Sequence, residues 1–270
     1  MTEFSDYTAS NKEAWERAAL KYQTEIEKDV AFLRSGGVNL LKPERRILGD
    51  LSNVRCAIHL QCSHGLDALS LLNLGVAEVV GVDISERMLE QARLKTKALR
   101  ASARWIESDV LSVPKTLNGT ADLVYTGRGA LPWVHDLDQW ASVVVRLLQP
   151  GGRLFVHEGH PLNWVWNSET TTYQLNENGR GYFDKRAIPN EDFPAMATAQ
   201  FTPEGEEIPT AWEWQWTLGQ VVTAVVNAGL QVEYLEEHAT HFWDQFQRIS
   251  PEEVGRLPQT YSLLARAPAA

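Results

Sequence analysis

A glycine and a carboxylate that follow two successive apolar segments are the residues whose types and spacing most clearly indicate chemistry. Gly65 comes after the apolar stretch that begins at Cys56, and Asp83 closes the next one, Val79-Val-Gly-Val. A buried strand that breaks at a glycine into a helix, followed by a strand that ends on an acid, is typical of a nucleotide-binding β-α-β unit. An acid about 20 residues beyond such a turn accepts both hydroxyls of a ribose. We therefore predict an adenosine-containing ligand.

The turn itself narrows the class of ligand. Its residues, His59-Leu-Gln61-Cys-Ser63-His-Gly65, include only one glycine. A pyrophosphate lies against the backbone only where several glycines permit it, so a dinucleotide is disfavoured relative to a ligand that presents a carboxylate and an ammonium group. The pattern Gly-x-x-x-x-Gly-Lys-Ser/Thr is absent, which argues against a nucleoside triphosphate.

Four segments, in this order, resemble the motifs of the class I S-adenosylmethionine-dependent methyltransferases. They are His59–Gly65, on the frame of the glycine motif with only its last glycine; Arg104-Trp-Ile-Glu-Ser-Asp109-Val110, like the third strand and its acid; Ala121–Thr126, like the fourth strand; and Leu147-Leu-Gln-Pro-Gly-Gly152, like the turn before the fifth. The resemblance implies an α/β, Rossmann-like methyltransferase fold. Its seven-stranded sheet is mostly parallel, has helices on both faces and ends with an antiparallel strand.

We interpret residues 1–270 as a single methyltransferase domain. Residues 1–50 are the N-terminal helical cap, because apolar positions recur at helical spacing over 9–35. Residues 51–158 are the cofactor-binding half. Residues 159–211 carry five prolines and no regular pattern, so we predict an insertion that covers the substrate.

Residues 212–270 are expected to complete the sheet. Thr217-Leu-Gly-Gln220 has the form of a capping box and opens a helix. A strand over 231–235 and the last strand over 261–266 follow. The alternating Trp212-Glu-Trp-Gln-Trp216 predicts a strand with three indoles on one face, packed in the core or in a hairpin.

Composition limits the partners. The chain has 35 acidic and 25 basic residues, a net charge of −10, and no basic cluster, which disfavours nucleic acid. No apolar run is long enough to span a membrane, and the first residues carry no secretion signal. Cys56 and Cys62 are expected to be buried thiols. We expect a cytoplasmic monomer or homodimer that binds a small-molecule substrate.

The resemblance also assigns residues to S-adenosylmethionine and its product S-adenosylhomocysteine. The predicted cofactor-binding residues are Trp15, Tyr22, Gln61, Gly65, Asp83, Ile84, Met88, Asp109, Val110, Thr126 and Arg128. Asp83 is placed on the ribose, Ile84 and Met88 against the adenine, and Asp109 with Val110 at its amine. Other roles remain open from the residues alone: a helix-end charge for Asp83, a loop position for Asp109, and core packing for Gln61. Arg128 either pairs with the cofactor carboxylate or forms a surface ion pair.

Methyl transfer is an in-line displacement at a sulfonium and needs orientation more than a covalent nucleophile. The candidate catalytic residues are Tyr7, Glu158, His160 and His241. Glu158 and the two histidines follow strand ends, on the ligand side of an open α/β sheet, although a histidine there also serves as a hydrogen-bonded structural residue. His-Glu-x-x-His is absent, and we expect no metal site.

Tryptophan is abundant, with ten residues in the chain. The predicted substrate-binding residues are Trp133, which follows the fourth strand, and Trp164, Trp166 and Trp243, which lie in segments without regular pattern. Trp133 is alternatively a ring that packs its loop against the next helix. We interpret the protein as a methyltransferase of a small aromatic molecule. It resembles bacterial enzymes of secondary metabolism, a group that includes indole C3-methyltransferases. The alternatives are O- or N-methylation of another small metabolite, or a noncatalytic ligand-binding protein on the same fold.

Overall fold

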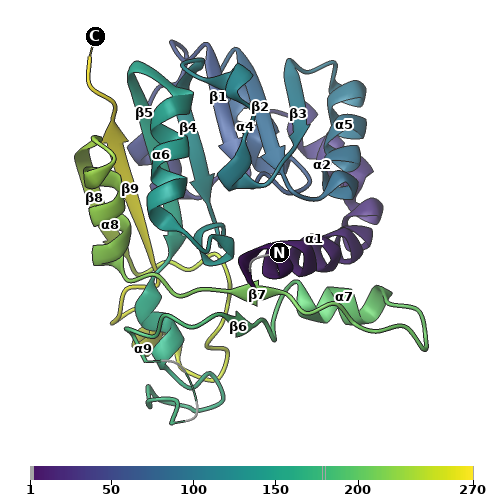
Figure 1. The fold of residues 1–270 in the computed structure, drawn as a ribbon, viewed down its shortest axis with the longest axis vertical. Coiled ribbons are helices and arrows are strands. Elements are labelled where there is room, and N and C mark those ends of the chain that lie inside the picture. The colour runs from purple at the N-terminus through teal and green to yellow at the C-terminus, as the bar shows by residue number, and fades with distance from the viewer. Residues whose placement is uncertain (1–2, 178, 180, 270) are drawn as a thin grey trace.

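The computed structural model describes residues 3–177, 179 and 181–269 and contains a seven-stranded sheet in the order β3-β2-β1-β4-β5-β9-β8 (Figure 1). The strands are β1 Cys56–Leu60, β2 Glu78–Asp83, β3 Ala103–Glu107, β4 Ala121–Gly127, β5 Leu148–Gly159, β8 Gln231–His238 and β9 Thr260–Arg266. Strands β1 to β5 pair in parallel, and β9 runs antiparallel to both β5 and β8. The predicted fold class, including the antiparallel last strand, is confirmed.

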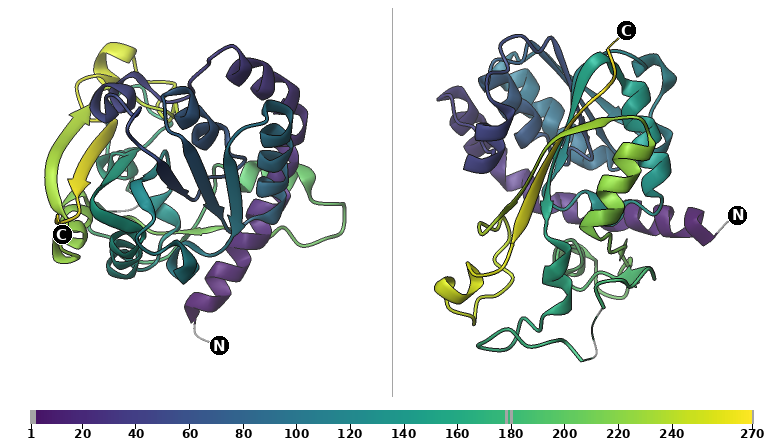
Figure 2. Two further views of the ribbon diagram at one scale, coloured as in Figure 1. Left: turned by 90° about the horizontal axis from the view of Figure 1, so that it is seen from above. Right: turned by 90° about the vertical axis from the view of Figure 1, so that its left-hand side faces the viewer.

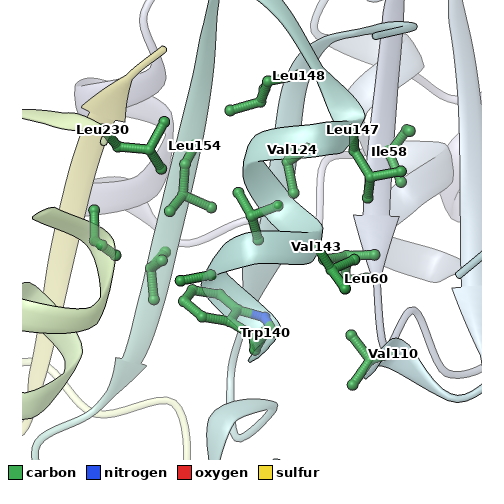
Figure 3. Packing of buried hydrophobic residues seen from close by; sticks show 14 of the residues in the cluster. Ile58, Leu60, Val110, Val124, Trp140, Val143, Leu147, Leu148, Leu154 and Leu230 are labelled. Atoms are coloured by element: carbon green, nitrogen blue, oxygen red, sulfur yellow. The ribbon is translucent and has the colours of Figure 1, made fainter. Parts of the chain in front are cut away.

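The central strands are buried on both faces of the sheet and are almost continuously apolar, whereas the edge strands β3 and β8 are partly exposed. On one face, Val80, Val124 and Leu154 pack against α6 (Leu137–Leu147) and α8 (Leu218–Asn227). Trp140 of α6 is fully buried at the centre of this layer (Figure 3). On the other face, residues such as Phe155 pack against α3 (Lys42–Leu48) and α4 (Leu66–Asn73). The right-hand view of Figure 2 shows the two helical layers on either side of the sheet.

Side-chain caps fix where the helices begin, and so hold the loops at the strand ends. Ser85 accepts a hydrogen bond from the Met88 N–H and opens α5 (Glu86–Leu99) directly after Asp83. The predicted capping box between Thr217 and Gln220 is present at the start of α8. Two short 3₁₀ turns, η2 Val110–Ser112 and η3 Lys115–Leu117, connect β3 to β4, and a third, η4 Leu131–Trp133, lies between β4 and α6.

The N-terminal cap and the insertion meet at the carboxyl ends of the strands. The cap comprises α1 Glu3–Ala18, η1 Ala19–Glu25, α2 Ile26–Arg34 and α3. The insertion and the segments after it comprise η5 Pro161–Val165, β6 Ile188–Pro189, α7 Ala195–Phe201, β7 Trp212–Glu213 and α9 Pro251–Val254. Asn11 of α1 exchanges two hydrogen bonds with the backbone of Trp212, and Thr198 of α7 donates to the carbonyl of Ala14. In Figure 1, α1, α7 and the β6–β7 ribbon lie together along the lower end of the sheet.

Two local predictions were wrong. The helix expected over 9–35 is divided, because a 3₁₀ segment, η1, separates α1 from α2. The strand expected over Trp212–Trp216 pairs at only its first two residues. Beyond them, the Trp214 N–H donates to the carbonyl of Pro132 and the Trp216 indole N–H donates to that of Val134. Hydrogen bonds to the segment after β4 therefore replace those of an extended hairpin.

Candidate active site

A cavity of about 510 Å³ lies at the carboxyl ends of the parallel strands. Its wall combines the loops after β1, β2, β3, β4 and β5 with the N-terminal cap and the insertion. Ligand pockets are roughly 300–1,000 Å³ and form at this edge of open α/β sheets. The cavity therefore has the size and the place of a ligand site for this architecture.

The turn after β1 adopts backbone conformations that glycine usually provides. Gln61 and Ser63 have φ of 56° and 48°, and Gly65 has φ of 79°. The Ser63 N–H donates to Asp83 Oδ2 at 2.7 Å, and Gln61 Nε2 donates to the carbonyl of Ala130 at 2.8 Å. Hydrogen bonds to β2 and to the loop after β4 thus hold a turn that its own sequence does not favour.

Gly65 does not line the cavity, contrary to prediction. A Cβ at this position would lie 2.6 Å from the Trp105 ring and 2.7 Å from Ala92 Cβ. Gly65 is therefore required for close packing of the turn against β3 and α5, behind the ligand wall.

Asp83 lies on the cavity wall at the end of β2 and is 9% exposed. Burial raises the pKa of its carboxyl to about 6. The N–H groups of Ser63 and Ser85 each donate to one of its oxygens. The Ile84 N–H also interacts with this carboxylate. A carboxylate has about four acceptor positions, so these backbone donors still leave acceptor capacity for a ligand hydroxyl.

Other residues predicted for the adenine end divide into those that line the cavity and those beneath it. Ile84, Asp109 and Val110 line it, and Asp109 also accepts the Leu111 N–H and so caps η2. Met88 and Thr126 do not line it, contrary to prediction, because both side chains are fully buried. Met88 faces the turn, where the Ser63 hydroxyl donates to its sulfur at 3.5 Å.

Trp15 and Tyr22 of the cap both line the cavity. The Trp15 ring contacts those of Trp133 and Phe193, with centroids 5.3 and 5.4 Å apart. Tyr22 stacks on His64 at 4.1 Å and contacts Phe193 at 6.0 Å. Phe193 therefore joins the cap to the insertion, and sequence analysis missed it. Its one available signal was an aromatic residue in a segment without packing pattern.

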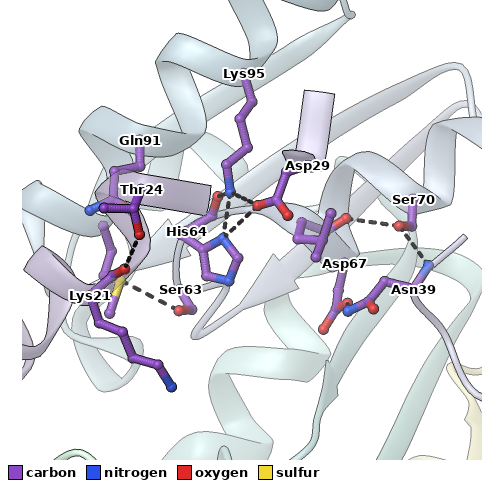
Figure 4. A network of polar contacts seen from close by, with 12 residues as sticks. Lys21, Thr24, Asp29, Asn39, Ser63, His64, Asp67, Ser70, Gln91 and Lys95 are labelled. Atoms are coloured by element: carbon purple, nitrogen blue, oxygen red, sulfur yellow. Dashed lines mark hydrogen bonds and ion pairs between the residues drawn. The ribbon is translucent and has the colours of Figure 1, made fainter. Parts of the chain in front are cut away.

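A buried ion pair ties the cap to the turn after β1 (Figure 4). Lys95 of α5 is fully buried, and its Nζ lies 2.7 Å from Asp29 Oδ2 of α2. The same ammonium donates to the His64 carbonyl at 2.9 Å and contacts His64 Nδ1. Because Tyr22 stacks on His64, this cluster places the cap residue against the cavity.

Arg128 lines the cavity, but its guanidinium pairs with Asp67 of α4. Asp67 also accepts a hydrogen bond from Asn39 Nδ2 at 2.6 Å. The ion pair is largely buried, which corrects the surface-pair interpretation of Arg128, whereas its contact with the cofactor carboxylate stays a prediction. Asp67 was missed, although an acid in the first turn of a helix after the glycine turn was a usable signal.

Of the four candidate catalytic residues, only Glu158 and His160 line the cavity. Burial raises the pKa of Glu158 to about 7 and lowers that of His160. Both groups are already engaged: Glu158 accepts three backbone N–H groups, and His160 Nε2 lies 2.8 Å from Glu237.

The other two candidates lie outside the cavity, contrary to prediction. Tyr7 packs against Trp212 and Trp214, with centroids 5.0 and 5.6 Å apart. The side chain of His241 is 43% exposed and faces Asp244.

Three of the four predicted substrate residues, Trp133, Trp164 and Trp243, line the cavity. Trp166 does not, because it packs against Tyr173 and the small apolar cluster around Phe246. Sequence analysis did not assign the other aromatic lining residues, which are Trp214, Trp216, Phe242 and Tyr261. Within the described ranges, no group of His, Cys, Asp or Glu is arranged to hold a metal ion. No helix there is long and apolar enough to cross a membrane.

Comparisons with known proteins agree with this architecture. Residues 57–152 match the family described as "Methyltransferase domain". Over 85 residues the chain is 38% identical to a demethylmenaquinone methyltransferase of Thermus thermophilus, covering 32% of this chain and 38% of that protein. Over 129 residues it is 35% identical to an uncharacterised transposon protein of Streptomyces fradiae, covering 47% and 35%. The chain thus spans little more than a third of the curated relatives it matches.

A solved S-adenosylmethionine-dependent methyltransferase of Mesorhizobium loti shares the fold over nearly its whole length. The TM-score is 0.60 at 21% identity, covering 83% of this chain and 95% of the other. The expected enzyme class and cofactor agree with these matches. Residues 57–152 therefore resemble a methyltransferase domain in sequence, and the chain has the fold of the solved S-adenosylmethionine-dependent methyltransferases.

Proposed function

We propose that this protein transfers the methyl group of S-adenosylmethionine to a small aromatic molecule. The observation that carries the proposal is the division of the cavity wall. Asp83, Ile84, Asp109 and Val110 line it at or just after strand ends, and Trp133, Trp164 and Trp243 line it from segments outside the sheet.

The residues present fit the cofactor. Asp83 keeps acceptor capacity for ribose hydroxyls beside the turn after β1. When bound, S-adenosylmethionine supplies an electrophilic methyl group on a sulfonium. Trp15 and Tyr22 exclude water from this end of the cavity, and aromatic faces also favour a cationic centre.

Among aromatic substrates we propose an indole, with transfer to ring carbon C3 in natural-product biosynthesis. An electron-rich carbon needs orientation more than a strong base. This requirement suits a cavity in which Glu158 and His160 already have hydrogen-bonding partners within the protein. Transfer to a phenol oxygen or to nitrogen is the alternative within the same enzyme class.

We also propose the division into a cap (1–50), a cofactor half (51–158), an insertion over the substrate (159–211) and a sheet-completing part (212–270). The contacts of Asn11 with Trp212 and of Trp15 with Phe193 support a roof built jointly by the cap and the insertion. The protein is further proposed to act in the cytoplasm, as a monomer or homodimer, without nucleic acid or membrane. The acidic composition supports the exclusion of nucleic acid.

Two successive experiments test the proposed function. Calorimetric titration with S-adenosylmethionine and S-adenosylhomocysteine must give heat, because a noncatalytic relative without cofactor gives none. Labelled S-adenosylmethionine is then supplied with a panel of indoles, phenols, amines and aliphatic acids, and NMR locates the added methyl. Transfer to an indole carbon supports the narrow proposal, and transfer to a phenol oxygen supports only the aromatic one. Turnover confined to aliphatic acids would overturn both.

A further inference from the structure

The segment that leaves β4 forms a concave row of backbone donors around one carboxylate. Arg128 and Gly129 have successive positive φ values of 57° and 93°. The N–H of Gly129 donates to Glu158 Oε2 at 2.9 Å, and those of Ala130 and Leu131 donate to Oε1 at 2.7 and 3.1 Å. Successive backbone N–H groups in such a turn make an anion-binding site. Here the anion is the carboxylate of Glu158, on the neighbouring strand β5.

We infer that Glu158 is a positioning residue, whose carboxylate fixes the shape of segment 127–133, and is not the base that takes a proton from substrate. The inference rests on the proposed methyl transfer, because residues of this segment line the cavity. Oε1 already accepts two N–H groups, which fills its usual acceptor capacity. Hydrogen bonds to an ionised acceptor are also stronger than neutral ones, so the contact holds the segment firmly.

Segment 127–133 joins the cofactor end of the cavity to its substrate end. The Ala130 carbonyl accepts Gln61 Nε2 from the turn after β1, and Trp133 contacts Trp15 of the cap. On the other side, the Pro132 carbonyl accepts the N–H of Trp214. A shift of the segment therefore moves both ends of the cavity together.

The surroundings of Glu158 contain few groups that titrate with it. Tyr261 lies opposite on β9, and His160 lies two residues along the chain. Glu237 of β8 faces His160, and the Arg128 side chain is turned to Asp67. Burial, the largest influence, raises the pKa of Glu158 to about 7. Because this pKa is raised, the contribution of Glu158 to the stability of the fold is present below about pH 4.5 and is lost as pH rises through 7, where the held carboxyl ionises.

The test compares Glu158→Gln with the parent and with Glu236→Gln, a control on β8 whose carboxylate pairs with Arg46. Hydrogen exchange followed by mass spectrometry reports directly on the amides of residues 129–131. In Glu158→Gln at pH 8 we expect these amides to exchange about tenfold faster. Loss of a charged acceptor should raise the equilibrium constant for opening of their hydrogen bonds by about a factor of ten. The affinity for S-adenosylhomocysteine is expected to fall by a similar factor. The change in this affinity with pH near 7, expected in the parent, should be absent in Glu158→Gln. The control should match the parent in all three measurements.

A second variant leaves the carboxylate intact. Ala130→Pro removes one N–H donor at a residue whose φ of −82° is close to that of proline. If Glu158 is a positioning residue, Ala130→Pro should raise KM and weaken S-adenosylhomocysteine binding, as loss of the carboxylate does. If Glu158 is a general base, kcat should be unchanged in Ala130→Pro, because the carboxylate is still present. A large loss of kcat in Glu158→Gln, with exchange, affinity and KM unaltered, would overturn the inference. A parent protein that binds no S-adenosylhomocysteine would instead contradict the proposed function, while the exchange measurement still decides the role of Glu158.

Discussion

The two ends of the cavity are built in different ways. At the cofactor end, the backbone at the tips of β1 and β2 is held by hydrogen bonds within one β-α-β unit, such as Ser63 N–H to Asp83. At the substrate end, aromatic rings and backbone contacts join segments far apart in sequence, as between Asn11 and Trp212. The tips of β1 and β2 are therefore specified locally, whereas the cap at the cofactor end and the whole substrate end depend on contacts between distant parts of the chain.

The buried cluster of Lys95, Asp29 and His64 joins the N-terminal cap to the turn after β1. Breaking it should have the largest effect on the free energy of unfolding. Lys95→Met leaves the buried Asp29 carboxylate without its cation and the His64 carbonyl without a donor. Breaking one side of a buried ion pair costs about 3–5 kcal/mol. Urea unfolding should show that loss, and calorimetry should show weaker binding of S-adenosylhomocysteine because His64 and Tyr22 move.

A matched control is Lys12→Met, which removes an exposed ion pair with Glu107. Its free energy of unfolding should change by no more than about 1 kcal/mol. Replacing both partners, in Asp29→Leu/Lys95→Met, should recover part of the lost stability. Equal stability of Lys95→Met and the parent would show that the cap does not depend on this pair.

Asp83→Ala tests the cofactor end alone. Removing a charged acceptor from hydroxyl donors costs roughly 1–3 kcal/mol, so the Kd for S-adenosylmethionine should rise by about one to two decades. The variant also leaves the N–H groups of Ser63 and Ser85 without their acceptor, so its unfolding must be measured beside its binding. If the variant is stable and its affinity for S-adenosylmethionine is unchanged, Asp83 does not bind the ribose and acts only as a charge at the start of a helix.

The same difference explains what the sequence predicted and what it did not. The strands, the turn and Asp83 follow from apolar runs and a break within about 30 residues of chain, so local patterns were sufficient. The pairing of Arg128 with Asp67 and the contact of Phe193 with Trp15 depend on tertiary packing across 61 and 178 positions. Trp166 and Trp164 carried the same signal, a tryptophan in an unpatterned segment. Only packing directs Trp164 to the cavity and Trp166 to Tyr173.

The pH dependence of cofactor binding sharpens the role of Asp83. Burial raises the pKa of its carboxyl from an ordinary 3.8 to about 6, and only the ionised form is a full acceptor for the ribose. S-adenosylhomocysteine affinity should therefore fall as pH drops below 6, by up to about tenfold per unit. The apo protein should respond in the opposite sense. A raised pKa means that the contribution of this group to stability is present below pH 4 and is lost as pH rises through 6.

Calorimetry from pH 5 to 8 checks this dependence, and Asp83→Asn should remove it. Repeating the series in Glu158→Gln separates the step of Asp83 from the one expected near pH 7. A parent profile that is flat from pH 5 to 8 would contradict an ionised acceptor at either position.

The smallest effect is expected at the substrate end, from Trp243→Ala. Trp243 is 51% exposed and lines the cavity, so its removal opens no hole in the core. Stacking on an aromatic guest contributes about 0.5–1.5 kcal/mol per ring pair, so KM for an aromatic substrate should rise a few-fold to about tenfold. The Kd for S-adenosylhomocysteine and the free energy of unfolding should stay close to the parent values.

Trp166→Ala is the matched comparison, because that ring packs with Tyr173 and the Phe246 cluster and does not line the cavity. It should lower the free energy of unfolding while leaving KM nearly unchanged. If the two variants exchanged these effects, the substrate would bind on the side of Trp166, and the division between the two ends of the cavity would have to be redrawn.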